Sequence, residues 1–174
     1  SCYSKSVGLC IILAQSGHYV PCKTFTFSPF TRLYTRITGD DNIFRGHSSF
    51  FVEMSELKSI LNYSDSKSIV IGDEVCKGTE DISAVAIVGT ALNTLLSRGT
   101  KFIFATHLHK LPSISILKNN PKIKIKHISI EFEETTIYTR KLKDGAGDVL
   151  YGLEIAHSIL KNEEFHSSAF KLRN

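Results

Sequence analysis

Acidic and imidazole side chains follow two apolar runs of the chain. Asp73 and Glu74 come directly after the run at 68–72, and His107 lies two residues beyond the run at 101–105. If the two runs are neighbouring parallel strands, the carboxylates and the imidazole converge at the carboxyl ends of the strands. Open α/β sheets bind their ligands at that edge. This convergence is the strongest functional signal in the sequence.

These side-chain types suit phosphoryl transfer to water. A carboxylate that ends a buried strand, here Asp73, can hold Mg²⁺ directly or through its water shell. The adjacent Glu74 can polarise an attacking water, and His107 can hydrogen-bond a γ-phosphate and respond to its loss. The simpler alternative is that the two acids only end the strand and cap the next turn, with His107 and His109 as ordinary core or surface histidines.

The segment between the two runs supports a parallel arrangement. Residues 81–99, "DISAVAIVGTALNTLLSRG", predict a long amphipathic helix that ends at Gly99. A strand, a helix and a second strand with short connections indicate a right-handed crossover between parallel strands. The predicted fold class is therefore α/β, with a mostly parallel sheet flanked by helices.

The remaining elements follow from apolar periodicity and from turn residues. Nearly continuous apolar positions predict a buried helix before Gly17, and helical spacing predicts another over 49–62. Short strands are expected within 18–38, including "RLYTRI". Period-two alternation at 124–134 and 135–143 predicts an antiparallel hairpin, and 151–160 a final short helix.

Composition excludes several classes of protein. The four cysteines form no C-x-x-C pair, which argues against a zinc site built from thiolates and against a small disulfide scaffold. The longest apolar run, Val7–Ala14, is too short to cross a membrane, so no membrane partner is expected. A net charge of +4 permits an anionic partner without requiring one. The expected setting is intracellular, with reduced thiols.

Five segments together resemble the ATPase domain of the MutS family of DNA mismatch-repair proteins. "SIVIGDEVCKGTED" resembles its Walker B segment and D-loop, and "RGHSSFFVEMSEL" resembles its signature segment. "FIFATHLHKL" is similar to its histidine switch, "AQSGHYVPC" to its A-Q-x-G-x-F-V-P-A segment, and "YGLEIA" to its late Y-G-x-x-V-A helix. The order of all five matches that of the family, over about residues 5 to 157.

The resemblance implies a P-loop NTPase fold of the ABC type, with ATP and Mg²⁺ as cofactors. Asp73 would be the acid on the magnesium side, and Ser1 would align with the hydroxyl residue that ends the phosphate loop. Glu74 would be the catalytic carboxylate and His107 the switch histidine.

The resemblance also implies a dimer in which two subunits enclose ATP. The partner would be a second MutS-like subunit, identical or different, and mismatched double-stranded DNA would bind through domains that lie upstream. The residues expected to face the partner's nucleotide are Arg45, Gly46, Ser48 and Ser49 in the signature segment and Gly78, Thr79 and Asp81 in the D-loop.

One departure from the family pattern is large. The phosphate loop, G-x-x-x-x-G-K-[ST], does not occur in these 174 residues. Lys5 is no substitute, because no glycine loop surrounds it. Because the chain begins at Ser1, we expect a piece of a longer protein. Residues 1–160 would form the ATPase domain without its phosphate loop, and 161–174 would begin a helical dimerisation segment.

The isolated chain is accordingly expected to bind ATP weakly or not at all. Two alternatives stay open: a non-catalytic relic or interaction module that keeps the ATPase fold, and a MutS-like protein that serves recombination.

Overall fold

The computed structural model describes residues 1–37, 49–132, 136–147 and 152–173. They divide into two compact units, Ser1–Asn120 and Pro121–Asn174. The first unit contains the parallel sheet and every described residue that the sequence assigns to the site. The predicted polar loop at 38–48 lies outside the described residues.

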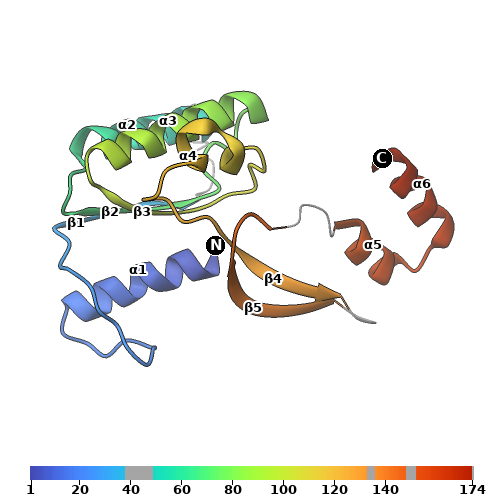
Figure 1. Cartoon of the computed structure of the whole chain (residues 1–174), viewed down its shortest axis with the longest axis horizontal. Coiled ribbons are helices and arrows are strands. Elements are labelled where there is room, and N and C mark those ends of the chain that lie inside the picture. Colours follow the sequence, from blue (N-terminus) through green and yellow to red (C-terminus); the bar gives the residue numbers. More distant parts are fainter. Residues whose placement is uncertain (38–48, 133–135, 148–151, 174) are drawn as a thin grey trace. The chain divides into compact units, whose positions relative to one another are not determined.

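A parallel three-stranded sheet organises the first unit, with strand order β1-β2-β3 (Figure 1). Asp73 pairs with Ala105, so β2 and β3 end at the same level. The neighbouring parallel strands that the sequence predicts are therefore confirmed. The elements of this unit are α1 (Cys2–Gln15), β1 (Arg32–Arg36), α2 (Ser49–Tyr63), β2 (Ser68–Asp73), α3 (Asp81–Ser97), β3 (Lys101–Ala105), the 3-10 turn η2 (Leu111–Ser113) and α4 (Ser115–Lys118).

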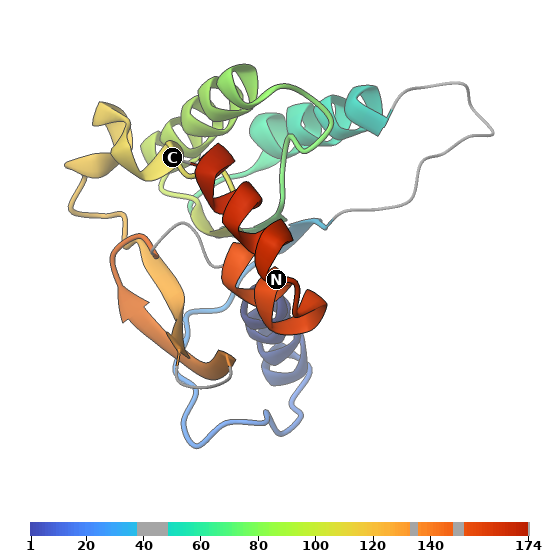
Figure 2. The ribbon, with the colours of Figure 1, turned by 90° about the vertical axis from the view of Figure 1, so that its right-hand side faces the viewer.

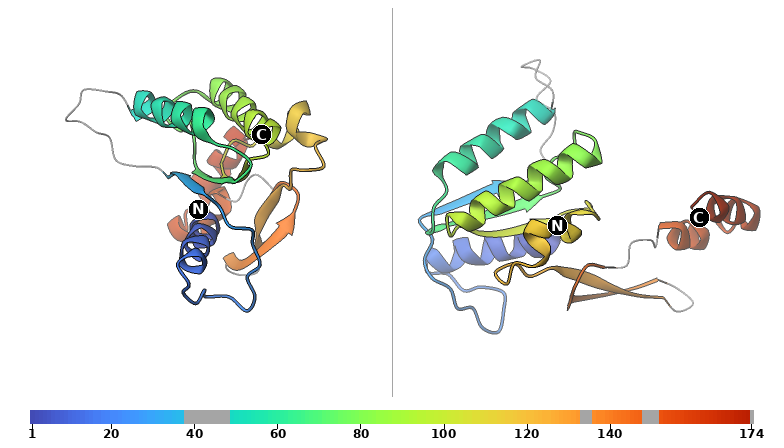
Figure 3. Two further views of the ribbon diagram at one scale, coloured as in Figure 1. Left: turned by 90° about the vertical axis from the view of Figure 1, so that its left-hand side faces the viewer. Right: turned by 45° about the horizontal axis from the view of Figure 1, so that its top comes forward.

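Helices cover both faces of this sheet. Figures 1 and 3 show α2 and α3 on one face and α1 on the other. Every residue of β2 is buried, as expected for a central parallel strand. Val70 faces α2 and α3, where it packs with Ile60 and Leu95. On the opposite face α1 approaches closely, since a Cβ at Gly8 would lie 2.6 Å from Cδ1 of Ile71.

The segment at 18–31 differs from the prediction of short strands. It contains no strand, and the first strand of the chain begins at Arg32. Pro21 and Pro29 lack the amide donor that a ladder requires, which explains the difference. The Gln15 side chain instead fixes the end of this segment, because its Oε1 accepts the Phe30 amide at 2.7 Å and its Nε2 donates to the Phe30 carbonyl at 3.1 Å.

The second unit contains an antiparallel hairpin and a pair of helices. Strands β4 (Lys126–Phe132) and β5 (Thr136–Asp144) pair as the sequence predicts, with an irregularity in register between Ile128 and Ile130. Figure 2 shows α5 (Gly152–Leu160) and α6 (Glu163–Arg173) joined by a tight turn. Among the described residues, none of the helices combines the length and the apolar character needed to cross a membrane.

Candidate functional site

The ends of β2 and β3 meet through the main chain as well as through side chains. The Glu74 amide donates a hydrogen bond to the Ala105 carbonyl at 2.9 Å. Nε2 of His107 lies 3.0 Å from Oε1 of Glu74. The carboxylates and the imidazole therefore converge at the carboxyl edge of the sheet, as the sequence predicts.

Asp73 is a buried carboxylate with polar partners on both oxygens. The Ser1 hydroxyl donates to Oδ1 at 2.6 Å, and Nζ of Lys5 lies 3.2 Å from Oδ2. The side chain is only 3% exposed, and burial opposes its ionisation. The hydrogen bonds from Ser1 and Lys5 outweigh burial and lower the pKa of Asp73 below its usual value. Asp73 is therefore an anion at neutral pH.

Glu74 is flanked by two cationic or potentially cationic groups. Nζ of Lys77 binds Oε2 at 2.8 Å, while His107 contacts the other oxygen. The hydrogen bond from Lys77 is the largest influence on the pKa of Glu74, and with the charges of Lys77 and His107 it lowers that pKa. Burial opposes the shift without reversing it. Glu74 is thus an ionised acceptor whose basicity Lys77 reduces.

The turn that follows β2 has an unusual backbone. Glu74 and Cys76 have φ angles of 51° and 67°, which residues other than glycine adopt at a cost of about 1–2 kcal/mol each. Oε1 of the buried Glu53, from α2, accepts the Cys76 amide at 2.7 Å. Nη2 of Arg36, at the end of β1, lies 3.6 Å from the same oxygen. Glu53 and Arg36 therefore hold the turn that carries Glu74.

The environment of this turn lowers the reactivity of the Cys76 thiol. The residue is 1% exposed. Burial first, and then the nearby charge of Glu53, raise the pKa of the Cys76 thiol to about 11, and the opposing charge of Arg36 does not reverse the shift. The free cysteine two residues after Glu74 is therefore a packing residue.

Sequence reasoning missed Glu53 and Arg36. A signal for Glu53 was present, because it lies on the same helical face as Leu57 and Ile60 and so occupies a core position. An acid on an apolar face requires a buried partner. Lys77 carried no comparable signal, because its contact with Glu74 depends on the geometry of the turn.

The residues expected at a dimer interface are only partly described. Asp81 is exposed at the start of α3, and Ser49 is the first residue of α2. A Cβ at Gly78 would lie 3.2 Å from Cβ of Phe50, so the D-loop packs against the start of α2. Arg45, Gly46 and Ser48 lie outside the described residues, and their predicted roles stay predictions.

The Ser1–Asp73 pair fits a magnesium ion. Mg²⁺ prefers oxygen ligands, and a hydroxyl and an ionised carboxylate stand side by side here. Ser1 is the N-cap residue directly before α1 and Asp73 ends β2, so the two ligands come from a helix start and a strand end.

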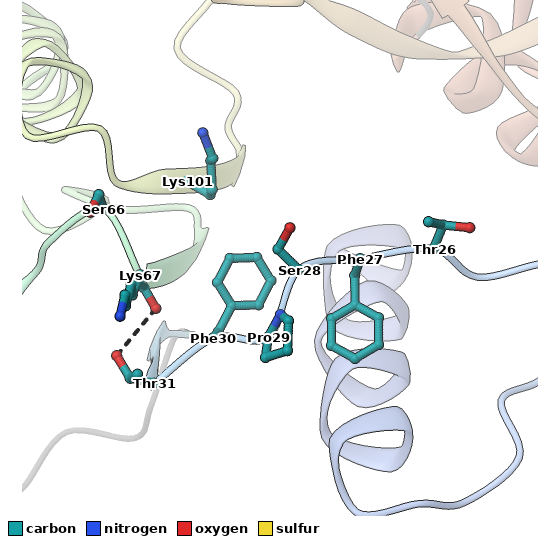
Figure 4. Close-up of a pocket in the computed structure, with 9 residues that line it drawn as sticks. All are labelled: Thr26, Phe27, Ser28, Pro29, Phe30, Thr31, Ser66, Lys67 and Lys101. Carbon is teal, nitrogen blue, oxygen red and sulfur yellow. Dashed lines mark hydrogen bonds between the residues drawn. The ribbon is translucent and has the colours of Figure 1, made fainter.

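A hollow in the first unit lies away from this chemistry. Its volume is about 680 Å³, and Phe30, Lys67 and Pro29 are among the residues that line it (Figure 4). Lys67 precedes β2 and Lys101 begins β3, so the hollow is at the amino edge of the sheet, opposite the carboxylates. It plays no part in the candidate site.

Comparisons with known proteins agree on one family. The family model described as MutS domain V matches residues 1–172. The chain is 47% identical over 95% of its length to a putative DNA mismatch repair protein, a mutS homolog, of Acanthamoeba polyphaga mimivirus. It is 39% identical over 97% of its length to the mitochondrial DNA mismatch repair protein mutS homolog of Sarcophyton glaucum. It is 37% identical over 90% of its length to the DNA mismatch repair protein MutS of Thermotoga maritima.

The chain corresponds to a small part of each relative. It spans 15% of the mimivirus protein, 17% of the Sarcophyton protein and 20% of the Thermotoga protein. The similarity therefore concerns one domain of much longer proteins.

Proposed function

The chain belongs to the MutS family, as its domain V, and from this premise we propose that it binds and hydrolyses ATP within a DNA mismatch-repair protein. The predicted P-loop ATPase fold class is confirmed by the family and by the parallel sheet. The catalytic and nucleotide assignments are proposals that rest on the geometry of the carboxyl edge, and the partner assignment is a proposal that rests on the family.

The observation that carries the proposal is the contact between Glu74 and His107. Their side chains meet at 3.0 Å, directly beside the Ser1–Asp73 pair. An ion-binding pair, an ionised acceptor and an imidazole are among the groups that a protein contributes to hydrolysis of a phosphoanhydride, beside the phosphate loop. A relic without activity has no physical need to keep them at one edge.

Each of these side chains has a proposed role. When bound, ATP would supply the phosphoryl group, and Mg²⁺ would neutralise the charge that develops on it. Ser1 and Asp73 hold the ion, and Glu74 orients and polarises the attacking water. His107, which contacts Glu74 in this structure, would exchange that contact for one with the γ-phosphate.

The partner of this domain is proposed from the family alone. A second MutS-like subunit would complete the nucleotide site through Ser48, Ser49, Arg45 and Gly46, with Asp81 at the same interface. Mismatched double-stranded DNA would bind through parts of the protein outside these residues. A role in recombination would use the same ATPase chemistry.

The test is the substitution Glu74→Gln in a full-length protein that contains this domain. Glutamine keeps the shape of Glu74 but cannot carry its charge. ATP binding should persist, while the hydrolysis rate should fall by about 10²-fold or more. Equilibrium binding of a fluorescent ATP analogue and phosphate release under single-turnover conditions measure the two separately. Glu164→Gln, an exposed residue of α6, is the matched control and should leave both unchanged.

Two results would contradict the proposal. Hydrolysis that is unchanged in Glu74→Gln would remove this residue from its role. A full-length protein that neither binds nor hydrolyses ATP would favour the interaction module instead.

A further inference from the structure

Two histidines and a glutamate meet where α5 passes into α6. One ligand atom from each of His157, Glu163 and His166 lies within 4.8 Å of the other two. This cluster belongs to the second unit, whereas the carboxylates of the ATP site belong to the first. Nothing in the proposed ATPase chemistry uses it.

The spacing of the three residues suits a single ion. Glu163 and His166 are three residues apart in α6, which places them on one face of that helix. His157 approaches from α5, with its Nε2 3.5 Å from Oε1 of Glu163. Two ligands that lie about 2.0–2.1 Å from a tetrahedral ion are separated by roughly 3.3–3.4 Å. The separation of His157 and Glu163 is therefore close to that of two ligands on one ion, and His166 lies within 4.8 Å of both.

The turn between the helices fixes this arrangement. Lys161 has a φ angle of 49°, and its amide donates to the His157 carbonyl at 2.9 Å, which ends α5. Oδ1 of Asn162 accepts the Phe165 amide at 2.9 Å and so caps the start of α6. The three side chains thus project from two consecutive helices whose connection is fixed by these hydrogen bonds.

One nitrogen of the cluster is buried without a hydrogen-bond partner. The imidazole rings of His157 and His166 lie 4.1 Å apart between centroids. Nδ1 of His157 is enclosed and has no hydrogen-bond partner. A divalent cation binds imidazole rings as neutral ligands and would use this unfilled polar capacity.

We propose that His157, Glu163 and His166 form a binding site for a divalent cation of the zinc class. Two imidazoles and one carboxylate are a ligand set that suits zinc and leaves a fourth position for water or an external donor. The ion would tie α5 to α6 and fix the angle between the two helices.

The experiment uses the untagged 174-residue chain with Zn²⁺ as the probe. Zinc affinity is measured by competition with a chromogenic chelator in excess Mg²⁺, which occupies oxygen sites such as the one at Asp73. One equivalent should bind, and His157→Gln and His166→Gln should each weaken the affinity by roughly 10- to 100-fold or more. His109→Gln, an exposed histidine outside the cluster, is the matched control and should bind as the parent chain does.

Spectroscopy identifies the ligands independently of affinity. Co²⁺ in place of zinc should give visible d–d bands without a thiolate charge-transfer band, because no cysteine belongs to the cluster. Far-UV circular dichroism of each variant without metal establishes that the helices persist.

Three results would overturn the proposal. The first is the absence of any stoichiometric zinc binding. The second is equal zinc binding by the parent chain and by the well-folded variants His157→Gln and His166→Gln. The third is loss of zinc binding in His107→Gln alone. The last would place the ion beside Glu74.

Discussion

At the residue scale, the structure shows that the carboxylate of Glu74 has a second partner besides the histidine. Lys77 binds one oxygen and His107 the other, so both oxygens are engaged before any nucleotide contacts them. A water that is to be polarised by Glu74 must displace one of these contacts. Both partners are exposed, Lys77 at 69% and His107 at 80%, so either contact can open to solvent at little cost.

Removal of the lysine charge should make Glu74 easier to protonate. The hydrogen bond and charge of Lys77 lower the pKa of Glu74, so the pKa should rise towards its ordinary value in Lys77→Met. The ¹³C shift of the Glu74 carboxyl, followed against pH in the 174-residue chain, measures this directly. In the full-length protein, the loss of hydrolysis rate on the acidic side of the pH profile should begin at a higher pH.

The matched variant for this prediction is Lys77→Arg, which keeps the positive charge. Its titration midpoint should stay close to that of the parent chain. A Glu74 midpoint that does not move in Lys77→Met would mean that the contact does not control the ionisation of this carboxylate.

At this scale the sequence predicted the acids and the histidine but not their lysine partners. Adjacent acids after an apolar run and a histidine after the next run are visible as patterns. Lys5 reaches Asp73 from one turn into α1, and this contact depends on how the helix approaches the strand. Side-chain reach of this kind is not encoded in spacing along the chain.

At the element scale, α2 stabilises the turn after β2 through one buried acid. Glu53 accepts the Cys76 amide and lies near the Arg36 guanidinium. Glu53→Ala leaves a buried amide without an acceptor and should lower the free energy of unfolding by about 1–3 kcal/mol. Urea unfolding followed by circular dichroism measures the loss. Glu53→Gln keeps an acceptor and should cost less.

The reactivity of the Cys76 thiol is a second measurement that tests this prediction, because it reports on the turn itself. Cys76 is buried under the turn, so its thiol should react faster with a thiol reagent in Glu53→Ala. The matched control is Glu56→Gln, because Glu56 is half exposed and contacts the same arginine at 3.1 Å. It should change stability by no more than about 0.5 kcal/mol. Equal losses in the two variants would contradict the role given to Glu53.

The elements themselves were largely predictable. The buried runs and the amphipathic helix between them gave β2, α3 and β3, because burial on both faces of a sheet requires continuous apolar residues. The segment at 18–31 was predicted wrongly, since aromatic and β-branched residues favour strands but prolines remove the donors that a ladder needs.

At the scale of the whole molecule, the phosphate loop is the part of the ATPase that these residues do not contain. The amides and lysine of such a loop supply much of the affinity for phosphates. We therefore expect the 174-residue chain alone to bind Mg-ATP with a Kd weaker than about 100 μM, against micromolar values for a complete site. Isothermal titration calorimetry measures this. Micromolar affinity of the isolated chain would contradict the prediction.

These 174 residues correspond to one domain of the relatives compared with them. The chain spans 15% to 20% of the relatives compared with it, and recognition of mismatched DNA is proposed for parts outside these residues. The predicted boundary between an ATPase domain at 1–160 and a dimerisation segment at 161–174 stays a prediction. The described residues divide instead into units at Asn120, a feature that no sequence pattern indicated.

The main-chain bond between Glu74 and Ala105 has a consequence for inherited variation in this gene segment. Because successive residues of a strand point to opposite sides, one codon added to β3 or removed from it would turn the His107 side chain away from Glu74. A changed codon at Phe102 or Ile103 would alter packing but leave that alignment intact. Selection on this stretch should therefore act more strongly on its length than on the identity of its apolar residues.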